Sequence, residues 1–334
     1  MHYLLAALGL ALTNPDPSAM SILREVRGGT AQCPRFAWTS IEAESLPEQV
    51  VVLIHGLDEP GDIWNTLAPA LAHEGLPALR FEYRDDGEVS RASADLIHAL
   101  EDLKLRGVKS VTLIGHSMGG LVALDAVTRP DGYSSVPNDQ ISLPSVLRLI
   151  TIATPFDGSA LAPMRAPLEI RDRAADLLRT PIVQWKTVLN TDDGAGEAST
   201  DLTPGSEFLR GLQSRGVPKG LAFTTIVARI GDDVKDSIGE LVDGEVTRET
   251  FGGATVDSWM RELGKGADAI GDGVVSMESA CAIACDDVVV VSGTHRGVIR
   301  GLSFVDIDNE ITKCDESNLP PAVPAVLQRM KLHR

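Results

Sequence analysis

The stretch Leu113-Ile114-Gly115-His116-Ser117-Met118-Gly119-Gly120 decides how the rest of this chain folds. An apolar, β-branched run, residues 108–114, leads into it, and a helical pattern of apolar residues, 121–127, follows it. Together they predict a strand, a tight turn and a helix, with Ser117 at the apex of the turn. Such a turn is strained and admits only small residues two positions before and after the serine, and both positions are glycines here.

The alternation of strand and helix continues on both sides of this stretch. Strands are predicted at residues 49–54, 76–83 and 146–153, and helices at residues 63–73 and 90–106. Strands that alternate with helices form a parallel sheet covered by helices on both faces. Ligands of such sheets bind beyond the carboxyl ends of the strands. We therefore expect His55-Gly56, Ser117 and Thr154-Pro155, which all follow strands, to meet at one edge.

One α/β domain is expected over residues 46–334, after an N-terminal segment, 1–45, with room for one or two edge strands. Residues 156–219 show no strand pattern and leave the sheet at the edge where the motifs meet, so we expect a helical cap or lid. An acidic second insertion is predicted at residues 231–270. Strand patterns at residues 221–230 and 286–292 complete the sheet.

Composition limits the class of protein and its partners. Hydrophobic residues make up 43% of the 334 residues and charged residues 23%, which predicts a globular chain with a sizeable core. The net charge of −17 argues against nucleic acid and anionic membrane surfaces as primary partners. No apolar run approaches the roughly 20 residues that span a bilayer. We expect a small-molecule or lipid substrate and no stable membrane insertion; the oligomeric state stays open.

The N-terminus leaves the cellular compartment open. Residues 3–12 are apolar and have the length of a signal-peptide core, but no Lys or Arg precedes them. A buried N-terminal segment is the competing interpretation. We therefore favour a cytoplasmic protein and keep export as the alternative.

The four cysteines do not predict a metal site. An even number, Cys33, Cys281, Cys285 and Cys314, permits disulfides in an exported protein and is equally ordinary for a reduced one. Cys281 and Cys285 are close enough in sequence to bond or to supply two ligands. No histidine or second cysteine pair lies nearby to complete a zinc site, so we expect no metal.

A serine at such a turn becomes a nucleophile when a histidine takes its proton and an acid orients that histidine. At this kind of turn the chain order is serine, acid, histidine. Of the seven histidines only His295 and His333 follow the predicted strands, and His333 is the penultimate residue. His295 follows the last strand through a short loop, so we predict that it is the general base for Ser117.

Two places are open for the acid. Asp272 lies in a loop with glycines on both sides, which would aim one carboxylate, whereas Asp232 and Asp233 directly follow a strand. We favour Asp272. The oxyanion of acyl transfer needs two N–H donors, for which we predict Met118, at the start of the helix, and Leu57, after the first buried strand.

At these residues the chain resembles the α/β-hydrolase superfamily, and its lipase and esterase branch in particular. The similarity extends to bacterial lipases and to relatives of the inositol-deacylating enzymes. The matching motifs are His55-Gly56-Leu57, Gly115 to Gly120, Ala153-Thr154-Pro155-Phe156-Asp157-Gly158-Ser159, Asp201-Leu202-Thr203-Pro204-Gly205-Ser206 and Gly271-Asp272-Gly273-Val274-Val275. Phe156 stands where relatives commonly have a histidine. The matches run in the family's order from about residue 50 to 300 and favour Asp272 over Asp232; residues 1–45 and 231–270 carry none.

The resemblance implies an α/β-hydrolase fold and a serine ester hydrolase, a carboxylesterase or lipase, that uses Ser117, His295 and Asp272 and needs no cofactor. We expect Trp185 and Phe156 to contact the substrate, and His116 either to contact it or to have a structural role. Trp185 belongs to an apolar stretch of the cap, residues 182–189, for which ordinary packing is an equal alternative. An acyltransferase with the same three residues and a non-catalytic binding protein with this fold are the alternative functions.

Overall fold

The computed structural model describes residues 18–27, 29–30, 34–41, 46–57, 59, 61–130, 143–159, 197–231, 243, 248, 252–264, 271–300, 304–305, 311–312 and 319–331. Trp185, Asp232, Asp233, Cys33 and Cys314 lie outside these residues. The predicted cap at 156–219 and the insertion at 231–270 are described only in part, so both stay predictions.

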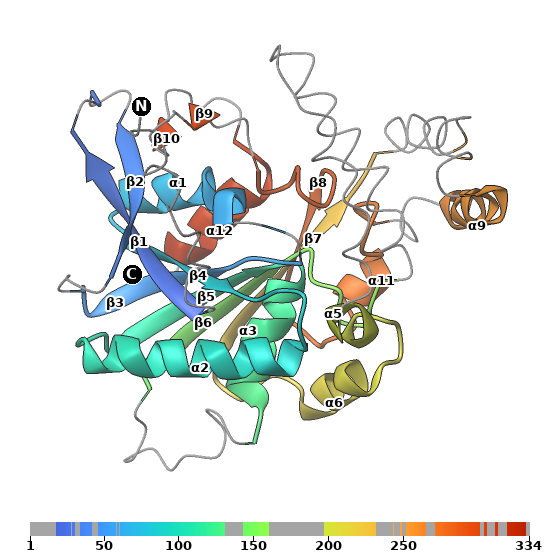
Figure 1. Ribbon diagram of the computed structural model, residues 1–334, viewed down its shortest axis with the longest axis horizontal. Helices are drawn as coiled ribbons and strands as arrows, with labels where there is room; N and C mark the ends of the chain where they lie inside the picture. The colour runs from blue at the N-terminus through green and yellow to red at the C-terminus, as the bar shows by residue number, and fades with distance from the viewer. Residues whose placement is uncertain are drawn as a thin grey trace, which may run out of the picture.

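The described residues form one ten-stranded sheet in the order β8-β7-β6-β5-β3-β4-β1-β2-β10-β9 (Figure 1). Strands β3 to β8 pair in parallel, and β1, β2, β9 and β10 extend the sheet with antiparallel pairs. The strands are β1 (Ser18–Val26), β2 (Arg35–Ser40), β3 (Gln49–Ile54), β4 (Ala78–Tyr83), β5 (Ser110–His116), β6 (Ser145–Ile152), β7 (Ala222–Arg229), β8 (Asp287–Ser292), β9 (Phe304–Val305) and β10 (Ile311–Thr312). The prediction of an α/β fold with a mostly parallel sheet is confirmed.

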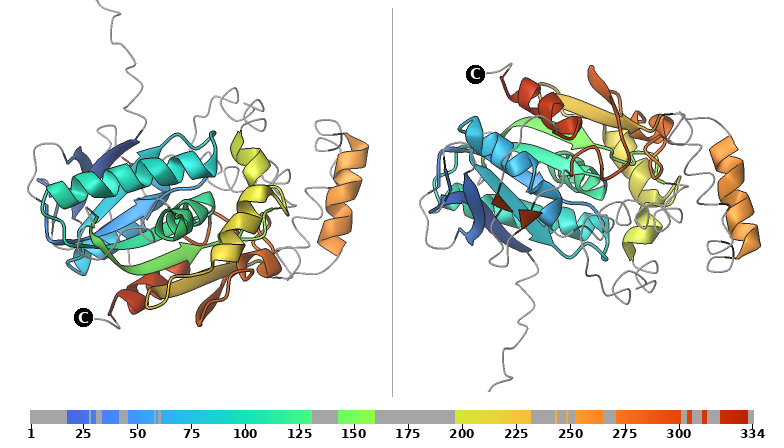
Figure 2. Two further views of the ribbon diagram at one scale, coloured as in Figure 1. Left: turned by 90° about the horizontal axis from the view of Figure 1, so that it is seen from below. Right: turned by 90° about the horizontal axis from the view of Figure 1, so that it is seen from above.

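Helices cover both faces of the sheet, and each face has its own hydrophobic cluster (Figure 1). One face carries α2 (Val89–Leu105), α3 (Met118–Thr128) and α6 (Glu207–Arg215), whose apolar side chains join one cluster. The other carries η1 (Gly61–Trp64), α1 (Leu67–His73) and α12 (Ala322–Lys331). The remaining described helices are α5 (Glu197–Asp201), α9 (Gly253–Gly264) and α11 (Met277–Ala280). Figure 2 shows α9 standing apart from the sheet.

The N-terminal strands β1 and β2 lie between β4 and β10, so both have a neighbour on each side. They extend the parallel strands on the side opposite β8. Strand β8 ends the sheet, and its burial alternates, with Val288 and Val290 exposed. Strands β6, β5 and β3 are consecutive neighbours in the sheet, so the predicted motifs that follow their carboxyl ends lie side by side at one edge.

Helix α12 lies in a proline-containing stretch for which the sequence pattern predicts no helix. Pro324 is the third residue of the helix, in the first turn, where backbone N–H groups have no intrahelical acceptor. The proline is therefore compatible with this helix. A short helix, α5, lies within residues 156–219, where helices are expected.

Helix α2 leaves one of its leucines exposed. Leu100 and Leu103 are buried, but 86% of the surface of Leu105 is exposed. Leu105 lies two residues after Leu103, which corresponds to a rotation of about 200° around a helix, so Leu105 points away from the sheet.

Among the helices that the structure describes, none combines the length and apolar character that a bilayer crossing requires.

Candidate active site

Ser117 occupies a strained turn between β5 and α3. Its φ of 53° and ψ of −128° lie where non-glycine residues are rare. Such strain costs about 1–3 kcal/mol and persists only where the surroundings enforce it. The Ser117 N–H donates to the Ile152 carbonyl at 2.9 Å, and the Gly120 N–H donates to the Ser117 carbonyl at 3.0 Å. Strand β6 and the first turn of α3 therefore hold the serine at the apex.

Three glycines let the turn pack closely. A Cβ on Gly115 would lie 2.5 Å from the backbone of Gly119, and one on Gly119 would overlap the Ile54 carbonyl oxygen. A Cβ on Gly120 would overlap Thr154. The start of α3 is thus pressed against the ends of β3 and β6, which places Ser117 between the segments that follow these strands.

The structure brings Ser117, His295 and Asp272 together. His295 Nε2 lies 2.9 Å from Ser117 Oγ, and His295 Nδ1 lies 2.7 Å from Asp272 Oδ2. The second carboxylate oxygen of Asp272 accepts the N–H groups of Val274 at 2.9 Å and Val275 at 2.8 Å. Asp272 and His295 are buried, whereas Ser117 is partly exposed. Because the carboxylate accepts from Nδ1, Nε2 is left to accept the hydroxyl proton of Ser117.

The loop that carries Asp272 is braced from the segment that follows β6. Ser159 Oγ donates to the Val274 carbonyl at 2.5 Å, and Ser279 Oγ donates to the Gly158 carbonyl at 2.6 Å. A Cβ on Gly271, whose φ is 57°, would overlap the Val275 carbonyl oxygen. Part of the motif at residues 153–159 thus has a structural use, which is to hold the acidic loop.

Both predicted oxyanion donors lie in segments next to Ser117. A Cβ on Gly56 would lie 2.7 Å from Ser117 Cβ, so the chain after β3 runs directly beside the serine. Leu57 follows Gly56 and packs against the cluster of the α2 and α3 face. Met118 is the first residue of α3, where backbone N–H groups have no intrahelical acceptor.

Two of the three predicted substrate contacts do not fit the structure. Phe156 and His116 have no exposed surface, so neither can touch a substrate in this conformation. Phe156 packs edge-on against Phe223, with ring centroids 6.1 Å apart. An apolar residue at a strand end looks the same in sequence whether it faces the core or a ligand, so the sequence alone does not separate these two cases for Phe156. The contacts of His116 with Glu59 and the His295 carbonyl oxygen fit the structural role that was its alternative. Trp185, the third, lies outside the described residues.

Glu59 is the site residue that sequence reasoning missed. Its buried carboxylate lies 2.6 Å from His116 Nδ1 and accepts the Gly56 N–H at 2.9 Å. Arg296 Nε donates to its other oxygen at 3.3 Å. Burial opposes ionisation of Glu59, but the charges of His116, Arg296 and His295 hold its pKa well below the ordinary value.

The described residues contain one group that could offer three metal ligands. Glu59, His116 and His295 each present a ligand atom within 4.8 Å of the others. These side chains already have hydrogen-bond partners. Glu59 bonds His116, His116 bonds the His295 carbonyl oxygen, and His295 bonds Asp272 and Ser117. A metal ion would have to break these hydrogen bonds, so the donor set fits a polar network better than a metal centre.

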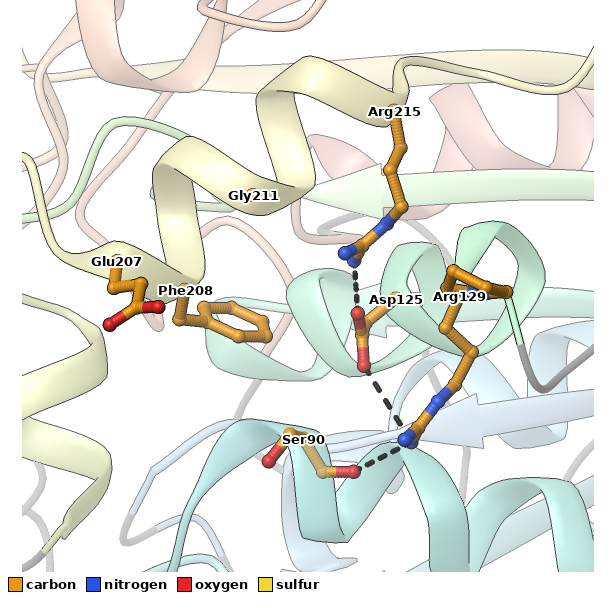
Figure 3. A pocket seen from close by; sticks show the side chains of 8 residues that line it. Ser90, Asp125, Arg129, Glu207, Phe208, Gly211 and Arg215 are labelled. Carbon is orange, nitrogen blue, oxygen red and sulfur yellow. Dashed lines mark hydrogen bonds and ion pairs between the residues drawn. The ribbon is translucent and has the colours of Figure 1, made fainter.

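A separate cavity of about 300 Å³ lies between α2, α3 and α6 (Figure 3). Asp125 stands between Arg129 and Arg215 there and pairs with both. Asp125 is eight residues beyond Ser117 in α3, about 12 Å along the helix. None of the predicted site residues lines this cavity.

The chain matches the family model described as "Alpha/beta hydrolase family" over residues 51–295. This protein is a member of the alpha/beta hydrolase family. The match starts within β3 and ends at His295, so this alpha/beta hydrolase has Ser117, Asp272 and His295 all inside the family region. The superfamily expected from the motifs is therefore confirmed.

Solved structures similar to this alpha/beta hydrolase share little sequence with it. The lipase BlEst2 of Bacillus licheniformis, in its mature form, is 19% identical, with 80% of this chain and 93% of that chain covered and a TM-score of 0.48. Phospholipase PlaB of Legionella pneumophila is 14% identical over 76% and 55%, with a TM-score of 0.47. A bromoperoxidase of Bacillus anthracis is 18% identical over 83% and 93%, with a TM-score of 0.41. No curated protein sequence matches the chain.

Proposed function

We propose that this alpha/beta hydrolase is a serine ester hydrolase that cleaves carboxylic esters through an acyl-enzyme intermediate. The proposal depends on one observation: the His295 ring bonds Ser117 Oγ through one nitrogen and the Asp272 carboxylate through the other. This connects a nucleophile, a base and an orienting acid in one chain of hydrogen bonds.

In the proposed first half-reaction Ser117 Oγ attacks the ester carbonyl carbon while His295 Nε2 takes the hydroxyl proton. The Asp272 carboxylate stabilises the imidazolium that forms. The N–H groups of Leu57 and Met118 hold the negative oxygen of the tetrahedral intermediate. When this intermediate collapses, the bond to the alcohol oxygen breaks and His295 returns the proton to the leaving alcohol.

In the second half-reaction water replaces the alcohol. His295 Nε2 takes a proton from the water as its oxygen attacks the acyl carbon on Ser117. Collapse of the second intermediate releases the carboxylic acid, and the proton returns to Ser117 Oγ. The cycle uses only side chains and backbone N–H groups of this chain and closes with one water consumed.

The test uses p-nitrophenyl esters from acetyl to palmitoyl, with and without micelles, on the wild type and on Ser117→Ala. We expect Ser117→Ala to lower kcat/KM by about 10³-fold or more, because the nucleophile is lost. Preference for long chains that increases with micelles would specify a lipase, and preference for short chains a carboxylesterase. Equal activity of the variant and the wild type would overturn the proposal.

A further inference from the structure

Glu59 joins three segments that converge on Ser117. Its carboxylate accepts the N–H of Gly56, which belongs to the chain after β3, and bonds His116 at the end of β5. Its other oxygen accepts from Arg296, next to His295. Its side chain is 1% exposed, so these contacts replace solvent almost completely.

His116 extends this network to the backbone of His295. Its Nε2 lies 2.9 Å from the His295 carbonyl oxygen, and a carbonyl oxygen can only accept a hydrogen bond. Its Nδ1 faces the ionised Glu59 carboxylate at 2.6 Å. The two ring nitrogens of His116 therefore hold two different loops. The rings of His116 and His295 also lie close, with centroids 4.8 Å apart.

The contacts bear directly on catalytic geometry. A Cβ on Gly56 would come within 2.7 Å of both Glu59 Oε2 and Ser117 Cβ, so the carboxylate and the serine both lie directly against this backbone. Leu57, the proposed oxyanion donor, is the next residue. A shift of Glu59 would therefore move Gly56 and the Leu57 N–H relative to Ser117.

We propose that Glu59 and His116 are positioning residues that hold the proposed oxyanion segment and the His295 loop in place around Ser117. The inference rests on the proposed ester hydrolysis. Neither side chain touches the substrate. Glu59 fixes the Gly56–Leu57 segment, His116 fixes the His295 backbone, and the bond between them makes the two segments move together.

The experiment compares Glu59→Gln, His116→Asn and the double variant with the wild type. Gln keeps the size of Glu59 but loses its charge and one acceptor. Asn places its amide near Nδ1 of His116, so the donor to Glu59 remains while the donor to the His295 carbonyl is lost. We expect each single variant to lower kcat on a p-nitrophenyl ester by about 10- to 100-fold, because misplacement by about 1 Å has that effect.

Two readouts separate positioning from general stability. KM should change by less than about threefold, and the rate of fluorophosphonate reaction with Ser117 in the folded protein should fall in parallel with kcat. The kcat of the double variant should be about equal to that of the slower single variant, because the two residues act as a unit. Asp125→Asn is the matched control: it removes a buried charge paired with two arginines in α3, away from Ser117. It should lower the melting temperature and leave kcat unchanged.

The outcomes are distinct. If Glu59→Gln and His116→Asn are folded and keep kcat within about twofold of the wild type, the positioning role is refuted. It is also refuted if Asp125→Asn lowers kcat as much as Glu59→Gln and His116→Asn do. A double variant whose fold-decrease in kcat equals the product of the two single decreases would refute it as well. Should Glu59→Gln not fold, the kcat and labelling rate of His116→Asn decide. A wild type that neither hydrolyses esters nor labels at Ser117 would instead overturn the proposed function.

Discussion

Asp272→Asn changes one atom of the proposed catalytic chain and leaves the acidic loop intact. In the structure Oδ1 of Asp272 accepts two backbone N–H groups, from Val274 and Val275, while Oδ2 bonds His295 Nδ1. An asparagine can keep its carbonyl oxygen toward the two N–H groups. Its amide nitrogen then faces His295 and can only donate there.

The magnitude follows from the tautomer of His295. With a donor at position 272, Nδ1 must become the acceptor and the ring proton moves to Nε2, which then cannot accept the proton of Ser117. The same change in a serine protease lowers kcat about 10⁴-fold. We expect a fall of about 10³- to 10⁴-fold, or roughly 4–5.5 kcal/mol of transition-state stabilisation. The free energy of unfolding should fall by less than about 1 kcal/mol, because both backbone donors keep their partner.

The assay measures kcat on a short-chain p-nitrophenyl ester and the free energy of unfolding in urea. Asp272→Ala is the comparison, because it removes the partner of both N–H groups and should cost roughly 2–6 kcal/mol of stability as well as activity. A folded Asp272→Asn variant with kcat within tenfold of the wild type would show that Asp272 does not set the tautomer of His295. In that case Asp232→Asn would be the next variant to measure, since Asp232 is the alternative acid.

Three further predictions concern packing and charge around the site. Gly119→Ala should cost about 1–3 kcal/mol of stability and lower kcat, because the new Cβ would overlap the Ile54 carbonyl oxygen; a wild-type urea curve and kcat would contradict this. Ser159→Ala should lower the free energy of unfolding by about 1 kcal/mol and also lower kcat, since the hydroxyl braces the Asp272 loop through the Val274 carbonyl. The pKa of Glu59 in the folded protein is held well below its ordinary value of 4.5. Ionised Glu59 therefore contributes fully to the free energy of unfolding above pH 4.5, and this contribution decreases as the pH falls toward the folded-state pKa. The stability difference between the wild type and Glu59→Gln, from urea curves at several pH values, should therefore be constant near neutral pH and shrink below pH 4.5; a difference independent of pH would contradict the ionised state.

Local sequence patterns predicted the parallel part of the fold well. The turn at Ser117 is encoded within residues 108–127, since the apolar run, the glycines and the following helix are adjacent in the chain. His295 could be singled out because the order of serine, acid and histidine excludes the earlier histidines. The pattern of residues favoured Asp272, which lies in a glycine-flanked loop, but left Asp232 as an alternative because it directly follows a predicted strand.

The rest depends on contacts between residues far apart in the chain. Glu59 stands among the acidic residues Asp58 and Asp62, and nothing in the sequence shows which of the three carboxylates is buried. The contacts of the Glu59 carboxylate with His116 and Arg296 form only in the folded protein, because these residues lie far from Glu59 in the chain. The burial of Phe156 is likewise decided by Phe223, on a neighbouring segment. Helix α12 was missed because prolines break a periodic pattern even in a first turn that tolerates them.

Activation of Ser117 by His295 can be measured by incubating the native protein with a fluorophosphonate and locating the adduct by peptide mass spectrometry. We expect one adduct per chain, on Ser117, that is lost when the protein is unfolded first and that forms much more slowly in His295→Ala. An adduct on another residue, or none on the folded wild type, would contradict it.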